Sequence, residues 1–113
     1  MVSEEMRRSA TMRLSTLKIL QNPLYLEIAL RLYVTNPDRV PYSNLVKTLM
    51  DMHSSGHASY LNGCHIEGDY YYVAGGALYD LVDCGIVNDQ SLTEEVNYSL
   101  TPEGYKIMRC LTE

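Results

Sequence analysis

Apolar residues recur at helical spacing through the first half of the chain. Residues 3–21 form a predicted helix with a second, smaller apolar strip at Met12 and Ile19. Residues 23–35 are apolar nearly all round, which is typical of a helix at the centre of a core. Residues 42–52 form a third predicted helix with one apolar face. The main strip of the first helix holds Met6, Ala10, Leu14, Leu17 and Leu20.

The helical period fails after this point and then returns. Residues 53–68 are rich in Gly, Ser and other polar residues, so they are predicted as an irregular connection. The pattern leaves room there for one helical turn around residues 58–62. Asp69 is predicted to cap a helix over residues 70–84, and Gly85 stands where a left-handed helix terminator belongs.

Alternating residues near the end of the chain predict a β-hairpin. Residues 86–90, "IVNDQ", form one strand, and residues 95–100, "EVNYSL", form the return strand. Thr101 can then cap a terminal helix, and Pro102 suits its first position. The sequence therefore predicts a mainly α protein with a small β-hairpin, which belongs to the α+β class.

Composition indicates one cytoplasmic domain. The chain has 113 residues, of which 46% are hydrophobic, and a chain of this size buries about 65% of its unfolded surface. No apolar run approaches the roughly 18 residues of a membrane span, and no signal-peptide pattern is visible. Three Cys without framework spacing favour free thiols in a reducing cytosol. We expect a single domain over residues 1–113, with a helix at 1–21 and a core at 22–113.

The order of these elements resembles the winged helix-turn-helix superfamily. The stretch "ALYDLVDCGIV", followed by a hairpin that ends in "NYSLTPEGY", is similar to transcription regulators of the PadR and MarR types. The resemblance implies about five helices plus a two-stranded wing, with residues 70–84 as the recognition helix of a DNA-binding transcription regulator. The matching residues are Leu78, Tyr79, Leu81, Gly85, Ile86, Val87, Tyr98, Leu100, Thr101, Pro102, Glu103 and Gly104.

The same resemblance implies which residues meet double-stranded DNA. Tyrosine side chains and an accessible glycine backbone on the recognition helix would lie near the groove, and basic side chains would reach phosphates. The residues expected to bind DNA are Tyr70, Tyr71, Tyr72, Gly75, Tyr79, Lys47, Arg7 and Arg8.

Charge points to a second class of function. The net charge is −5, and neither the predicted recognition helix nor the hairpin carries an Arg or Lys. The hairpin instead carries Asp89, Glu94 and Glu95, whereas DNA phosphates usually meet Lys, Arg or other donors. The connection at 53–68 is also longer than the usual turn of a helix-turn-helix. The alternative is a winged-helix protein–protein interaction module without DNA binding, which the Tyr-rich helix suits.

Four residues of the irregular connection have side chains that can bind metals: His53, His57, Cys64 and His65. His53 and His57 are four residues apart, a spacing that places two imidazoles on one helix face. The surrounding Gly and Ser residues disfavour that helix, so we interpret the group as a polar loop and predict no metal and no cofactor. The chain also lacks a Gly-rich phosphate loop and a Gly-x-Ser-x-Gly motif, so we predict no enzyme.

The helix predicted at residues 1–21 is surplus to a winged-helix core. One apolar strip can cover the domain, whereas the second strip would remain in water, which suggests a partner surface. Soluble homo-oligomers are most often two-fold dimers, so a homodimer is expected. The alternative is that this helix wraps its own domain. The expected dimer interface comprises Met12, Leu14, Ile19 and Met108.

Overall fold

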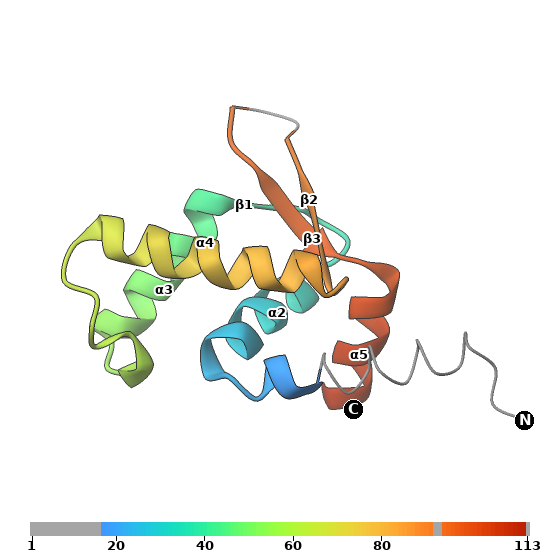
Figure 1. The fold of residues 1–113 in the computed structure, drawn as a ribbon, viewed down its shortest axis with the longest axis horizontal. Coiled ribbons are helices and arrows are strands. Elements are labelled where there is room, and N and C mark those ends of the chain that lie inside the picture. Colours follow the sequence, from blue (N-terminus) through green and yellow to red (C-terminus); the bar gives the residue numbers. More distant parts are fainter. Residues whose placement is uncertain (1–16, 92–93, 113) are drawn as a thin grey trace, which may run out of the picture.

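The computed structural model describes residues 17–91 and 94–112 and shows helices packed beside a small antiparallel sheet (Figure 1). The predicted α+β class is confirmed. Residues 17–20 are helical, and the rest of the helix predicted at 3–21 lies outside the described residues. The elements in chain order are α2 (Pro23–Thr35), β1 (Val40–Pro41), α3 (Tyr42–Ser54), the 3₁₀ turn η1 (Ser59–Leu61), α4 (Glu67–Asp83), β2 (Val87–Gln90), β3 (Asn97–Leu100) and α5 (Pro102–Thr112).

Helix α2 lies at the centre of the core, as its apolar pattern predicts. The Asn22 side chain caps it by accepting a hydrogen bond from the Leu24 amide at 3.0 Å, and Pro23 takes the first position. The helix packs against α4, α5 and β3. Its buried residues are Leu24, Ile28, Ala29 and Leu32. Among the described residues, no helix is both long enough and apolar enough to span a membrane.

The sheet has three strands in the order β1-β3-β2, all antiparallel. The predicted hairpin is present, with Val87 opposite Leu100 and Asp89 opposite Tyr98. The sheet also has a third strand that the sequence did not predict, because Val40 and Pro41 pair with β3. A strand of two residues, one of them Pro, has no alternation of its own. Main-chain pairing with β3 makes this segment a strand. The Tyr42 amide continues the pairing by donating to the Val96 carbonyl at 3.0 Å.

The junction between β3 and α5 explains the sequence "LTPEGY". The Thr101 hydroxyl caps α5 by accepting from the Gly104 amide at 2.9 Å, and it donates to the Gly85 carbonyl at 2.6 Å. The predicted cap and the helix start at Pro102 are therefore confirmed. Gly104 is buried against the Ile86 backbone, where an added Cβ would lie 2.9 Å from the Ile86 carbonyl carbon. The start of α5 therefore packs against, and hydrogen-bonds to, the residues that lead into β2.

Helix α4 begins three residues earlier than predicted. It starts at Glu67, and Asp69 lies within its first turn rather than before it. The Asp69 carboxylate reaches back to accept hydrogen bonds from the amides of His65 at 2.7 Å and Ile66 at 3.1 Å. These amides lower the pKa of Asp69 below its usual value. Asp69 therefore satisfies the unpaired amides at this end from inside the helix, as an acidic residue in a first turn can.

Candidate nucleic-acid interface

Helices α3 and α4 are the pair expected to form a helix-turn-helix, and they pack directly against each other (Figure 1). The connection between them includes η1, which lies where the sequence pattern left room for one helical turn around residues 58–62. Although polar in sequence, the connection buries Ala58, Leu61 and Cys64. Its length therefore adds a small folded segment to the core and leaves the contact between the two helices intact.

The four tyrosines predicted to bind DNA divide into two pairs. Tyr72 and Tyr79 are 85% and 73% exposed and lie seven residues apart, on the same side of α4. Tyr70 is half-buried, with its hydroxyl 2.6 Å from Nδ1 of His53. Tyr71 is also half-buried, with its ring edge-on to Tyr42 at 5.3 Å between centroids. The outward surface of α4 is therefore the pair Tyr72 and Tyr79 with exposed Gly76 between them.

Gly75 is half-buried and faces Tyr42 of α3, so its backbone is not open on the outer surface of α4. The Tyr42 hydroxyl donates to the Tyr71 carbonyl, and a Cβ added at Gly75 would lie 2.7 Å from that hydroxyl oxygen. Gly75 therefore lets α3 and α4 approach closely. Lys47 is exposed on α3, whereas Arg7 and Arg8 lie outside the described residues.

Every charged side chain on α4 and the hairpin is acidic. Residues 66–100 contain no Lys or Arg. Some of the carboxylates are engaged within the chain: the Tyr25 hydroxyl donates to Asp80, and Glu95 accepts from the Ser43 amide and hydroxyl at 3.2 and 2.9 Å. The hydrogen bond to Asp80 raises the pKa of Tyr25. Within α4, residues 70–79 carry no charged side chain.

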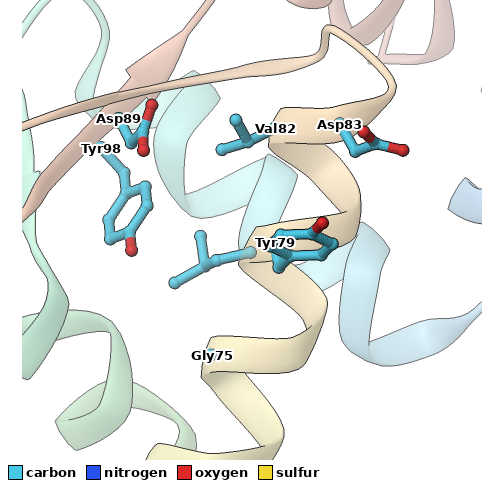
Figure 2. A pocket seen from close by; sticks show the side chains of 7 residues that line it. Gly75, Tyr79, Val82, Asp83, Asp89 and Tyr98 are labelled. Carbon is cyan, nitrogen blue, oxygen red and sulfur yellow. The ribbon is translucent and has the colours of Figure 1, made fainter.

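A hollow of about 310 Å³ lies between α4 and the hairpin. Figure 2 shows Asp89 and Tyr98 on the side of the strands, Tyr79 and Asp83 on the side of α4, and Val82 between them. Burial raises the pKa of the Tyr98 hydroxyl, and the nearby Tyr42 and Asp89 raise it further. The hollow is lined by Gly75, Leu78, Tyr79, Val82, Asp83, Asp89 and Tyr98.

The four residues considered for metal binding do not form a common site: His53 is hydrogen-bonded, Cys64 is buried, and His57 and His65 are exposed. Nε2 of His53 lies 3.0 Å from Oδ1 of Asn62, an oxygen that only accepts, so in the neutral ring Nδ1 accepts from Tyr70. Cys64 is buried, and burial raises the pKa of its thiol, which disfavours the thiolate that binds metals. His57 and His65 are exposed. Over residues 17–91 and 94–112, no three His, Cys, Asp or Glu side chains gather as a metal site.

The structure separates the residues expected at a dimer interface. Met108 is fully buried in this chain's own core, which removes it from a partner surface. Its helix α5 is strongly amphipathic, so the Met side chain turns inward against α2 and the sheet. Ile19 is half-buried against the same core, whereas the nearby Leu17 is 44% exposed. Met12 and Leu14 lie outside the described residues.

Comparison with known proteins bears on the fold. No protein-family model matches the chain, and no curated protein matches it. The solved structure of reduced HlyU from Vibrio cholerae N16961 is similar to it, with a TM-score of 0.60 and 19% identity over 96% of this chain and 94% of that one. This chain has the winged-helix fold. At this identity the likeness shows the fold alone. The winged-helix part of the resemblance is thereby confirmed, and the wing is the hairpin β2–β3.

Sequence reasoning missed the hollow between α4 and the wing. Asp83 and Tyr79 come from the helix, while Asp89 and Tyr98 come from opposite strands of the wing. Two signals in the sequence could have located part of it. The helical spacing of Tyr79 and Asp83 places them one turn apart, and the hairpin register sets Asp89 opposite Tyr98.

Proposed function

We propose that this protein is a winged-helix transcription regulator that binds double-stranded DNA through α4. The observation that carries the proposal is the uncharged surface of residues 70–79, from which Tyr72 and Tyr79 project. The likeness to HlyU supports the winged-helix fold on which this proposal rests. Tyrosine hydroxyls can donate to phosphates and base edges, and exposed Gly76 allows the helix to approach a groove closely. The proposed role is binding without catalysis.

The acidic surroundings set how this binding should depend on salt. Lys47 is the exposed cation of α3, and the α4–wing surface adds none. Few counterions would therefore be released, so the logarithm of the binding constant should fall with the logarithm of salt concentration with a slope of only about −1 to −2. A mobility-shift titration of genomic duplex fragments at two salt concentrations measures this slope. Absence of any shift at low salt would overturn the proposal.

Variants of the exposed tyrosines locate the surface. Replacing Tyr72 and Tyr79 together by Ala should abolish the shift, since it removes both outward hydroxyls. Val34→Ala is the matched control, because Val34 is 71% exposed but lies on α2. Equal binding by the double tyrosine variant and the Val34 control would show that α4 does not carry the DNA contact.

A second candidate is a module that binds another protein. The acidic charge of residues 66–100 favours it, because a polyanion is repelled by such a surface while a basic protein is attracted. Exposed tyrosines also suit a protein interface. The duplex titration separates the candidates, since failure to bind any duplex at low salt contradicts the first and leaves the second.

We also propose a homodimer built on the first helix. The exposed Leu17 beside half-buried Ile19 supports an apolar surface at the end of the first helix. A two-fold arrangement would present two α4 helices to neighbouring half-sites. Light scattering should give twice the monomer mass of 12.8 kDa, and deletion of residues 1–21 should leave a folded monomer. A full-length monomer at micromolar concentration would contradict this arrangement.

A further inference from the structure

The hollow between α4 and the wing is bordered by two carboxylates. Asp83 lies at the end of α4 and Asp89 on β2, and neither carboxylate forms a hydrogen bond or ion pair with a described residue. Asp80, one turn before Asp83, is already engaged by the Tyr25 hydroxyl. Two negative charges at one small hollow repel each other and favour entry of a positive charge.

The walls of the hollow suit a particular shape of cation. Tyr79 and Tyr98 stand on its two sides, as Figure 2 shows, and each ring offers a face that attracts a cation. Burial raises the pKa of Tyr98, so this phenol remains neutral at physiological pH and adds no further repulsion. Leu78 and Val82 supply apolar lining, against which the methylene stem of a long side chain can pack.

We propose that this hollow binds an arginine side chain presented by a basic protein partner. The proposal deepens the second candidate function and rests on it. A guanidinium is planar, stacks on aromatic rings and donates to a carboxylate through a rigid fork of N–H groups, whereas an ammonium is a compact point charge. The volume of about 310 Å³ is at the low end of the roughly 300–1,000 Å³ typical of ligand pockets, as befits one side chain.

The surface around the hollow indicates a protein as the source of this arginine. Tyr79 borders the hollow and, with Tyr72, projects from the same side of α4. Tyr and Arg are enriched among the residues that dominate binding energy at protein interfaces. A partner that inserts one arginine would therefore meet exposed tyrosines next to the insertion point, while its remaining basic residues would face the acidic wing.

Amide NMR of the full chain, titrated with a short peptide that carries one arginine between uncharged residues, tests the proposal. A peptide with citrulline in place of arginine is the matched probe, because citrulline keeps the shape and loses the charge. The arginine peptide should shift the amides of Gly75, Asp83 and Asp89 at concentrations about tenfold lower than the citrulline peptide. Equal shifts from both peptides, or shifts confined to other parts of the chain, would overturn the proposal. Tighter binding of spermidine than of the arginine peptide would show that a free polyamine, and not a side chain of a partner protein, occupies the hollow.

Neutral variants of the two carboxylates separate this site from the DNA proposal. Asp83→Asn and Asp89→Asn should each weaken binding of the arginine peptide by up to about tenfold, since each removes a negative charge that attracts the guanidinium. Asp51→Asn on α3 removes the same charge from an exposed residue that does not line the hollow, and it should leave the affinity unchanged. The amide spectrum of each variant reports that it is folded. Affinity equal to that of the unmodified chain in both hollow variants would overturn the proposal.

The same variants should respond in the opposite direction to DNA. Removing a negative charge beside α4 lowers repulsion of phosphates, so duplex binding should tighten in Asp83→Asn. Duplex binding without peptide binding would overturn the arginine site and leave the DNA proposal standing. Peptide binding without duplex binding would overturn the DNA proposal and support the arginine site.

Discussion

Gly75 of α4 lies directly beneath the hydroxyl of Tyr42 on α3. A Cβ added at Gly75 would stand 2.7 Å from that oxygen, which itself donates to the carbonyl of Tyr71 one turn earlier. The Tyr42 ring also meets the Tyr71 ring edge-on. The two helices of the helix-turn-helix are thus joined by a polar contact that requires the absence of a side chain at one position of α4.

The neighbouring glycines of α4 should respond differently to Ala. Gly76 has no atom within 4 Å of an added Cβ, so Gly76→Ala should raise the free energy of unfolding by about 1 kcal/mol through helix propensity. Gly75→Ala gains the same propensity but displaces the Tyr42 hydroxyl, which costs about 1 kcal/mol for the lost hydrogen bond and more for repacking. Urea unfolding should therefore find Gly75→Ala less stable than Gly76→Ala by about 1–2 kcal/mol.

A Tyr42→Phe background shows whether the hydroxyl is the cause. Without that oxygen, the next atom near an added Cβ is the ring carbon at 3.7 Å, an ordinary contact. In this background Gly75→Ala should become as stabilising as Gly76→Ala. Equal stabilisation by the two glycine replacements in the unmodified chain would contradict the close approach.

The start of α5 should tolerate no side chain at Gly104. An added Cβ would lie 2.9 Å from the carbonyl carbon of Ile86 and 3.1 Å from its Cα, both of which are backbone atoms. Gly104→Ala must therefore push α5 away from the wing and should lower the free energy of unfolding by at least about 1–3 kcal/mol. Gly63→Ala is the control, with open space around its added Cβ. Thermal unfolding measures both, and a Gly104→Ala melting temperature equal to that of the control would refute this packing.

Alkaline pH should destabilise the protein through its hydrogen-bonded and buried tyrosines. The hydrogen bond to Asp80 raises the pKa of Tyr25, and burial raises the pKa values of Tyr42, Tyr60 and Tyr98. Unfolded tyrosine titrates near about 10. Below that pH both states keep their protons and the stability is fully present. As pH rises above about 10, the unfolded chain loses protons that the folded chain retains, so the free energy of unfolding falls.

Replacement of Tyr25 isolates one part of this effect. At neutral pH, Tyr25→Phe should lower the free energy of unfolding by about 1 kcal/mol, because Asp80 loses a hydrogen-bond donor. Between about pH 9 and about pH 10.5, the free energy of unfolding should fall less in Tyr25→Phe than in the unmodified chain. Tyr72→Phe is the control at neutral pH, since Tyr72 is 85% exposed. Urea unfolding at each pH gives the comparison. An unchanged alkaline slope in Tyr25→Phe would show that the contact with Asp80 does not hold the phenol proton.

Local patterns in the sequence predicted most of the fold. Asn22 before Pro23 and Thr101 before Pro102 located the starts of α2 and α5, because caps act through neighbouring backbone amides. Strand β1 escaped prediction because Val40–Pro41 is a strand only through pairing with β3. The start of α4 was misplaced because an Asp can satisfy helix amides from inside the first turn as well as from before it.

The candidate site was less predictable than the fold, since it depends on which side chains meet across elements. Three consecutive tyrosines point in different directions on a helix, and only Tyr72 of them is exposed. The hydroxyl that donates to the Tyr71 carbonyl belongs to Tyr42, which is 29 residues away in the sequence. The hollow likewise joins Asp83 to Asp89 and Tyr98 through the packing of α4 on the wing. Such contacts have no periodic signature in the sequence.

Selection of duplexes from a randomised library is the most direct measurement of the central claim, which is that α4 reads DNA. Selection at low salt should enrich one sequence motif, arranged as two half-sites about 10 base pairs apart if the protein is a two-fold dimer. The motif should disappear in the variant that carries Tyr72→Ala and Tyr79→Ala and persist in Val34→Ala. No enrichment by the unmodified protein at low salt, or the same motif from the double tyrosine variant, would contradict the account.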